Sequence, residues 1–204
     1  MLEDLLQAFS QGQRRALARL LTLLAQGKCP REIIRRLPLP EQQSRVVALT
    51  GSAGVGKSTL TGKLLEVIRL KNQSVAVLAC DPRSPLSGGS LLGDRFRMPA
   101  NPEDEGVFIR SLSTPGGQSA ILKQIPDMIH LLRAFGFEVI LIETVGAGQG
   151  DTHVREFVDS LVLLLQPETG DALQWENLGL RYVAHRDVIH FAALPPADLV
   201  EAQV

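Results

Sequence analysis

Nine consecutive residues in the first third of the chain have the types and spacing needed to hold a row of phosphates. Three glycines let the backbone curl so that several N–H groups point inward, and a following helix would add its positive N-terminal end. A lysine supplies a point charge between two phosphates, a serine hydroxyl suits Mg²⁺, and a threonine reaches the first phosphate. The pattern GxxxxGK[ST] therefore predicts a phosphate-binding loop of Gly51, Ser52, Ala53, Gly54, Val55, Gly56, Lys57, Ser58 and Thr59.

The segments on either side of this loop fit the same prediction. Residues 46–49 form a short apolar run typical of a buried strand, and residues 57–70 have the pattern of a helix. A strand, the loop and a helix in this order are the context that confirms such a motif. We therefore predict nucleotide binding, and a glycine-rich turn without a ligand is the alternative.

Acidic residues follow two other apolar runs. Asp81 comes after residues 75–79, and Glu143 comes after residues 139–142. Carboxylates in such positions can hold Mg²⁺ directly or through a water molecule, and Glu143 can also orient water. We expect both acids to lie near the metal, and the alternative for Asp81 is a turn cap before Pro82.

Two glycine-rich segments contain the remaining candidate residues. Asp94 lies among glycines and arginines in residues 88–97, an arrangement that suits a mobile segment closing on a ligand. Gly146 follows Glu143 closely enough to give its N–H to a γ-phosphate, and residues 146–150 can reorder when that phosphate leaves. The alternatives are a surface ion pair of Asp94 with a nearby arginine and a plain connecting loop.

Apolar runs alternate with helical segments from residue 45 onward. This alternation predicts an α/β fold of the P-loop NTPase type, with a mostly parallel sheet and helices on both faces. Ligands of such sheets bind at the carboxyl ends of the strands, which is where the loop and the acids fall. The predicted strands are residues 46–49, 75–79, 107–109, 139–142, 161–165 and 188–191.

We predict a small N-terminal helical region at residues 1–40, followed by a P-loop GTPase domain at 41–204. Leucines at helical spacing indicate two helices that end near Gly12 and Gly27, and Pro30 opens a short basic helix. The simpler interpretation is a helical appendage packed on the main domain. The alternative is a partner-binding surface that uses Arg31, Arg35 and Arg36.

The composition is that of a globular protein with little net charge. The 204 residues carry a net charge of −1, which favours neither nucleic acid nor an anionic membrane as a partner. No apolar run approaches the length of a membrane span, and the acidic start lacks the features of a secretory signal. Cys29 and Cys80 form no CxxC pair, which indicates free thiols in a reducing, cytoplasmic compartment and argues against a zinc or iron–sulfur site.

With these residues in view, the chain resembles the MeaB/ArgK family. These are P-loop GTPases that chaperone the cobalamin-dependent methylmalonyl-CoA mutase, and they have also been called lysine/arginine/ornithine transport ATPases. The strings SGGxxLGDRxRM at 87–98 and ETVGxGQ at 143–149 are highly specific, and the similarity runs from about residue 10 to 190. These strings lie within matching stretches at 84–98 and 136–149, and the other matching stretches are residues 51–60, 75–82, 108–111 and 170–174.

The resemblance implies a Mg²⁺-dependent GTPase with GTP and GDP as ligands and a cobalamin-dependent acyl-CoA mutase as partner. In the family, two switch regions relay the nucleotide state to the mutase, gate cofactor delivery and protect the enzyme from inactivation. By resemblance, Asp81 and Asp94 lie near Mg²⁺ and the first switch, and Glu143 heads the second switch. The catalytic candidates are Lys57, Asp94 and Glu143, and the metal candidates are Ser58, Asp81, Asp94 and Glu143.

The sequence departs from the family pattern where the family reads guanine with the motif NKxD. That place reads His190-Phe191-Ala192-Ala193, so the aspartate that accepts two hydrogen bonds from guanine is Ala193 here. A site without those hydrogen bonds loses much of its preference for guanine, and stacking on Phe191 would tolerate any base.

Other departures concern the loops and the C-terminal end. Arg83 replaces a small residue of the family, and residues 114–118 replace an Arg-Gly-rich loop. The family continues beyond the point that matches Val204 with a strand, a base-contacting loop and dimerisation helices. We therefore expect a domain that is incomplete relative to the family, and a homodimer would lack the family's usual contacts.

Three functional hypotheses follow. The first is a slow GTPase that chaperones a mutase, and the second is a non-catalytic or base-unselective nucleotide-binding scaffold. The third, a nickel or zinc chaperone GTPase, is disfavoured because the chain has only two cysteines and four scattered histidines. A partition ATPase is disfavoured because Ser52 and Ala53 stand where such proteins carry an extra lysine.

Overall fold

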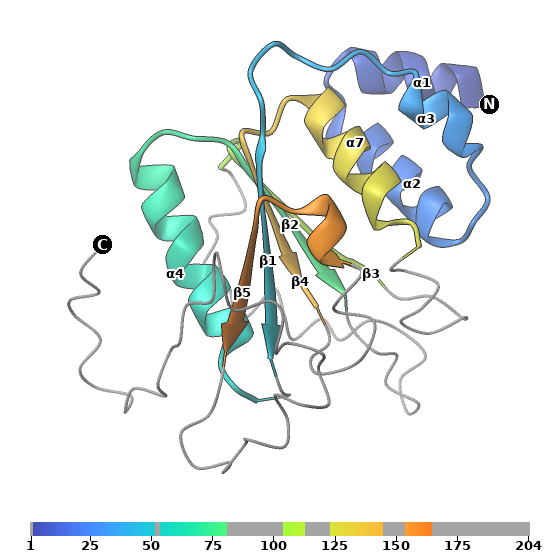
Figure 1. Ribbon diagram of the computed structural model, residues 1–204. Coiled ribbons are helices and arrows are strands. Elements are labelled where there is room, and N and C mark those ends of the chain that lie inside the picture. Colours follow the sequence, from blue (N-terminus) through green and yellow to red (C-terminus); the bar gives the residue numbers. More distant parts are fainter. Residues whose placement is uncertain (1, 52–53, 81–103, 113–122, 145–153, 165–204) are drawn as a thin grey trace.

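A parallel sheet forms the centre of the structure (Figure 1). The computed structural model describes residues 2–51, 54–80, 104–112, 123–144 and 154–164. Five strands lie in the order β3-β2-β4-β1-β5, and every neighbouring pair is parallel. They are β1 (Arg45–Gly51), β2 (Val75–Cys80), β3 (Val107–Leu112), β4 (Val139–Glu143) and β5 (Ser160–Leu164).

The strands have near-continuous apolar sequences because both faces of the sheet are covered. Every residue of β2 is buried, and β2 lies between β3 and β4. Five of the predicted strands are confirmed within a few residues, and the run at 188–191 lies outside the described residues. The fold is therefore the predicted α/β class, with all described strands ending at one edge of the sheet.

Helices cover the two faces unequally in the part of the chain that the structure describes. One face carries α4 (Lys57–Leu70), whose Leu65 packs with Leu49 of β1 and Val77 of β2. The predicted helix after the loop is thus confirmed. The other face carries four helices (Figure 1), namely α1 (Leu2–Ser10), α2 (Arg14–Ala25), α3 (Arg31–Arg35) and α7 (Ile125–Phe135).

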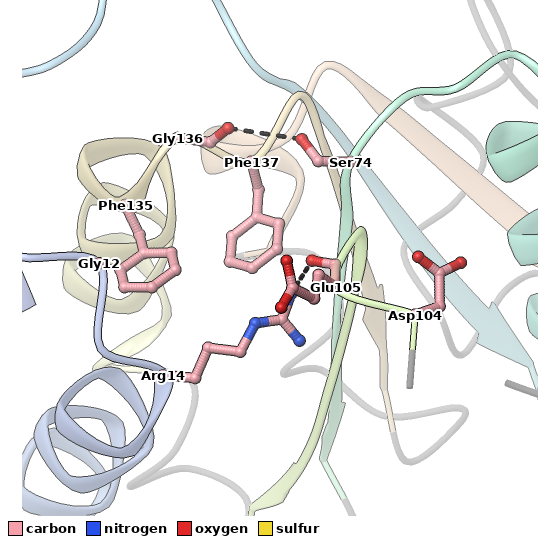
Figure 2. A pocket seen from close by; sticks show the side chains of 8 residues that line it. All are labelled: Gly12, Arg14, Ser74, Asp104, Glu105, Phe135, Gly136 and Phe137. Carbon is pink, nitrogen blue, oxygen red and sulfur yellow. Dashed lines mark hydrogen bonds between the residues drawn. The ribbon is translucent and has the colours of Figure 1, made fainter. Parts of the chain in front are cut away.

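The N-terminal helices are attached to the sheet by a long-range contact. Gly12 takes a positive φ of 75° in the turn after α1, so α2 starts at the predicted break. At the start of α2, the Arg14 guanidinium donates to the carbonyl oxygen of Val107 at 2.6 Å and also to that of Glu105 (Figure 2). The helices therefore pack on the sheet, and the boundary between residues 1–40 and 41–204 remains a prediction.

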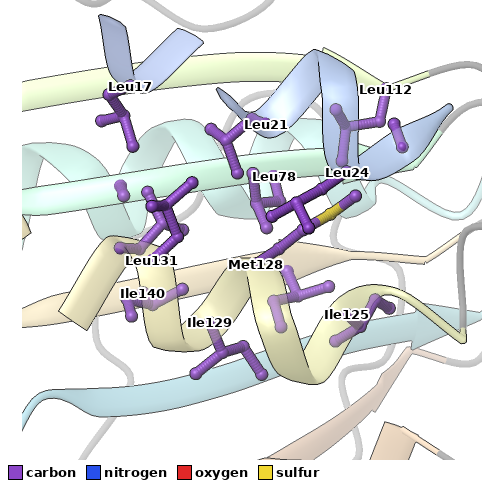
Figure 3. Packing of buried hydrophobic residues seen from close by; sticks show 14 of the residues in the cluster. Leu17, Leu21, Leu24, Leu78, Leu112, Ile125, Met128, Ile129, Leu131 and Ile140 are labelled. Atoms are coloured by element: carbon purple, nitrogen blue, oxygen red, sulfur yellow. The ribbon is translucent and has the colours of Figure 1, made fainter. Parts of the chain in front are cut away.

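The larger core lies between the sheet and helices α2 and α7 (Figure 3). Leu17, Leu21 and Leu24 of α2 are fully buried in this cluster, and Met128 of α7 is buried with them. Burying one such side chain stabilises the fold by about 1.5–3 kcal/mol, so these helices contribute a large part of the total. Helix α7 was not predicted from the sequence, although it forms one side of the core.

Two further expectations can be compared with the described residues. Cys29 and Cys80 are both buried thiols and form no disulfide, as predicted. Burial raises the pKa of the Cys29 thiol, and the nearby Asp127 carboxylate adds to this effect. In the part of the chain that the structure describes, every helix is too short or too polar to cross a lipid bilayer.

Candidate phosphate-binding site

The glycine-rich loop follows an inner strand of the sheet, at the end where the strands have their carboxyl termini. Strand β1, which runs between β4 and β5, ends at Gly51, and α4 begins at Lys57. The loop therefore lies where ligands bind in open α/β sheets, and it leads into the N-terminus of a fourteen-residue helix. That helix end attracts negative charge, because its first N–H groups have no partner within the helix.

Gly51 has both an unusual backbone angle and no room for a side chain. Its φ is 144°, and a Cβ atom there would lie 2.5 Å from the carbonyl oxygen of Leu164. Leu164 is its register partner on the neighbouring strand β5, so the obstacle is backbone that cannot simply turn away. Gly51 thus allows the last residue of β1 to pack closely against the backbone of β5, and the loop starts at this residue.

Two further glycines shape the rest of the loop. Gly54 and Gly56 have φ angles of 82° and 99°, and Gly56 is the residue directly before the first turn of α4. Left-handed backbone of this kind is costly for any other residue type and turns successive N–H groups toward one side. The predicted glycine roles are therefore consistent with the backbone. Val55 between them is half-buried and packs against the core beneath α4.

Lys57 crosses the mouth of the loop. It is 9% exposed, and its Nζ donates a hydrogen bond to the carbonyl oxygen of Gly51 at 2.8 Å. This contact holds a buried positive charge against the base of the loop, beside the helix end. A buried ammonium group in such surroundings is strongly stabilised by an anion, which is the chemistry expected of a phosphate ligand.

Ser58 and Glu143 come together from distant parts of the chain. The Ser58 hydroxyl donates to Oε1 of Glu143 at 2.7 Å, although the two residues are separated by 85 positions. The contact exists because β4 is the neighbour of β1, with Glu143 in register with Leu49. Oxygen donors of this kind are the ligands that Mg²⁺ prefers, so the pair fits a magnesium ion.

Thr144 is a residue that the sequence analysis did not assign to the site. Its N–H donates to the carbonyl oxygen of Leu49 at 2.9 Å, and its side chain is buried with the hydroxyl 3.4 Å from the same oxygen. These contacts extend the β1–β4 ladder by one residue and hold the backbone next to Glu143. The sequence did contain a sign of this role, because Thr144 is a polar residue directly after an apolar strand that ends in an acid.

The structure places only part of the predicted site. Thr59 is exposed in the first turn of α4. Described and brought together are the glycines of the loop, Lys57, Ser58 and Glu143. The candidates outside the described residues are Ser52, Ala53, Asp81, Asp94 and Gly146. Residues 190–193, which stand at the place of the family's guanine-reading motif, also lie outside them.

A separate cavity of about 550 Å³ lies at the other edge of the sheet (Figure 2). Phe135 and Phe137 stack along one side of it with ring centroids 5.5 Å apart, and Arg14 and Glu105 border it. Ser74 and Asp104, which also line it, come just before the first residues of β2 and β3, so the cavity lies at the amino ends of these strands and the loop lies at the carboxyl ends. It is no part of the phosphate-binding site.

A parallel sheet in which an inner strand, β1, leads through a glycine-rich loop into a helix, with a lysine that contacts the start of that loop, defines a P-loop nucleoside-triphosphate-binding protein. Comparison with known proteins then narrows the class. A family model described as Methylmalonyl Co-A mutase-associated GTPase MeaB matches residues 17–200. The chain belongs to this family.

Individual relatives agree with that assignment. A Pyrococcus abyssi protein provisionally named a GTPase is 41% identical over 199 residues, which are 97% of this chain and 61% of the relative. The protein named fused isobutyryl-CoA mutase of Cupriavidus metallidurans is 38% identical over 197 residues, 94% of this chain and 18% of that protein. The chain thus spans about three fifths of the length of its Pyrococcus abyssi relative.

A solved structure supports the fold. The crystal structure of an LAO/AO transport system kinase matches with a TM-score of 0.58 and 21% identity, over 94% of this chain and 68% of that one. At this identity the match shows the P-loop fold alone. The predicted family and fold class are both confirmed.

Proposed function

We propose that the chain binds GTP with Mg²⁺ at residues 51–59, hydrolyses it slowly, and passes its nucleotide state to a cobalamin-dependent acyl-CoA mutase. The observation that carries the proposal is the built loop. Gly51 accepts a hydrogen bond from the buried Lys57 ammonium at 2.8 Å, and Ser58 lies 2.7 Å from Glu143. The family description as mutase-associated GTPases supports the choice of nucleotide and partner.

Each residue of the loop has a proposed role. The curled backbone at Gly54 and Gly56 and the first turn of α4 bind phosphate oxygens through N–H groups, and Lys57 places its charge on the outer phosphates. Ser58 and Glu143 would hold Mg²⁺, which supplies charge neutralisation on the phosphates when bound.

The remaining roles rest on the sequence. We propose that Asp81 and Asp94 belong to the metal surroundings and the first switch, and that Gly146 contacts the γ-phosphate. Glu143 would orient the attacking water, with Lys57 and Asp94 completing the catalytic set. Such a catalyst works by positioning and charge rather than by covalent chemistry, which fits a slow reaction.

The mutase partner is supported by a relative. A protein whose name is fused isobutyryl-CoA mutase contains a segment 38% identical to 94% of this chain. Domains that are joined in one polypeptide commonly work together. We therefore propose that this chain works with a mutase of the same reaction class, either as a separate protein or linked to it. Isobutyryl-CoA and methylmalonyl-CoA mutases share the transfer of a group within an acyl-CoA, so the partner is proposed at that level.

Calorimetric titration with GTP, GDP and ATP, each with and without Mg²⁺, tests the proposal. We expect GTP binding that requires Mg²⁺ for full strength, with slow phosphate release in a turnover assay. Lys57→Ala should weaken triphosphate binding by about 10- to 100-fold, because a hydrogen bond to a charged group contributes about 1.5–3 kcal/mol. The matched control is Lys71→Ala, which removes an exposed lysine just beyond the other end of α4 and should bind normally.

The same titration decides between the proposal and its alternative. Equal affinity for GTP and ATP would favour the base-unselective scaffold, which the alanine at position 193 in place of the guanine-reading aspartate makes a specific option. Binding without any turnover would favour a non-catalytic role. Normal binding and turnover in Lys57→Ala would contradict the assignment of the loop itself.

A further inference from the structure

Positive charge is concentrated in the N-terminal helices. Residues 11–36 contain seven arginines and lysines and one acid, Glu32. The whole chain has 21 basic and 22 acidic residues, so everything outside this segment is clearly acidic. A solvated helix surface usually mixes both signs, and α2 contains no acidic residue at all. The segment thus differs in charge from the body to which it is attached.

Three of these arginines are used inside the fold. Arg14 donates to the backbone carbonyls of Glu105 and Val107 at the start of β3, as described above. Arg31 and Arg35 both pair with Asp127 of α7, a carboxylate with only 1% of its side chain exposed, and the Arg35 Nε lies 2.7 Å from it. Arg31 and Arg35 were predicted as possible partner-binding residues. Because each already has an ionic partner within the chain, they are less suited to bind another protein.

Four other basic residues have no such use. Arg15, Arg19, Lys28 and Arg36 are exposed, and none forms an ion pair within the described part of the chain. We call these four residues the basic face. Arg15 and Arg19 are four positions apart on α2 and so share one side of that helix, whereas Lys28 follows the end of α2 and Arg36 follows the end of α3. Both helices cover the same face of the sheet (Figure 1).

The basic face is unfavourable for the helices that carry it. Arg15 lies in the first turn of α2, where a positive charge opposes the helix dipole and an acid would be preferred. Arg19 lies one turn further along, so the two guanidinium groups repel each other. Residues that oppose local stability without an internal partner are expected at places that serve an external one.

We propose that the basic face is a docking surface for an acidic surface of a partner protein, which on the proposed function is the acyl-CoA mutase. The charge of the face selects an acidic partner. A protein is favoured over a membrane, because four of the five leucines of α2 are buried and the partly buried Leu23 packs against the same core, which leaves little apolar surface to insert into lipid. It is favoured over nucleic acid, because α2 and α3 contain no aromatic residue that could stack on bases.

The test compares two double variants with the same change in net charge. Arg15→Glu with Arg19→Glu reverses the charge of the two α2 residues of the basic face. Lys63→Glu with Lys71→Glu reverses one exposed lysine of α4 and one just beyond its end, on the opposite face of the sheet. Binding of each chain to methylmalonyl-CoA mutase and to poly-L-glutamate is measured at low and moderate salt. We expect the first variant to bind the mutase about 10-fold more weakly and to lose most of its salt dependence, with the second variant within about 2-fold of wild type.

Nucleotide affinity and circular dichroism of both variants separate this proposal from the proposed function. Intact nucleotide binding with lost mutase binding in the first variant alone supports the basic face. Equal mutase binding by both variants would overturn it. If the wild-type chain binds no mutase, the partner assignment fails. Binding to poly-L-glutamate then tests the basic face, which is supported if only the first variant binds this polymer more weakly than wild type. Stronger binding to duplex DNA or phosphatidylglycerol vesicles than to poly-L-glutamate would also overturn the choice of an acidic protein.

Discussion

Replacing Gly51 with alanine should destabilise the protein far more than the addition of one methyl group suggests. The φ of 144° is a backbone conformation that alanine rarely adopts, and holding it there costs about 1–3 kcal/mol. The new Cβ would also lie 2.5 Å from the Leu164 carbonyl oxygen, 3.1 Å from Val55 Cγ1 and 3.2 Å from Leu164 Cβ. Relieving that overlap requires β1 and β5 to move apart, which adds about 1–3 kcal/mol.

The expected total for Gly51→Ala is therefore roughly 2–6 kcal/mol, a large fraction of the about 5–15 kcal/mol that stabilises a typical domain. The matched control is Gly54→Ala in the same loop. Its φ is 82°, and nothing lies within 4 Å of the added Cβ, so only the backbone term of about 1–3 kcal/mol applies. Urea unfolding followed by circular dichroism measures both variants.

The difference between the two variants isolates the contact with β5. We expect Gly51→Ala to unfold at lower urea than Gly54→Ala and to lose triphosphate binding, because the first residue of the loop is displaced. If both variants had the same free energy of unfolding, within about 0.5 kcal/mol, the close approach of Gly51 to Leu164 would have no energetic meaning. The reasoning about this strand end would then be wrong.

Two other predictions concern carboxylates away from the loop. Asp127→Asn should lower the free energy of unfolding by about 1–3 kcal/mol, because Arg31 and Arg35 of α3 lose their buried charged acceptor. The control is Glu32→Gln on α3, which should change the free energy of unfolding by less than about 0.5 kcal/mol in the same urea titration. The Ser74 backbone N–H holds the pKa of Glu138 below its ordinary 4.5, so its stabilising effect is complete above that pH and is lost as the pH falls through the lowered pKa. Stability measured between about pH 3 and 6 should therefore decline less steeply on acidification in Glu138→Gln than in wild type, and an unchanged slope would contradict this account.

Local pattern was sufficient for the strands and for the loop with its helix. The apolar runs are continuous because the sheet is covered on both faces, and the loop motif combines glycine, lysine and serine at fixed spacing. The same information predicted that Ser58 and Glu143 belong to one site. The 2.7 Å contact between them needs β4 beside β1, and strand order is decided by long-range packing that no local pattern reports.

The omission of α7 has a different cause. The signal was present, because Ile125, Met128, Ile129 and Leu132 recur at helical spacing and Pro126 opens the helix. A crossover between the parallel strands β3 and β4 also needs a connection of a dozen residues or more, which is usually a helix. The internal use of Arg31 could not be foreseen, since its partner Asp127 lies 96 residues away and only the folded chain brings them together.

The arrangement of the N-terminal helices has a consequence for biosynthesis. Arg31 and Asp127 are 96 residues apart, so α2 and α3 leave the ribosome long before α7, the helix that packs against the leucines of α2, is synthesised. At about 5–20 residues per second, the wait is about 5–20 s. During that interval the apolar side of α2 is exposed to solvent on the nascent chain, which favours binding by holding chaperones and makes this stage sensitive to stalled translation.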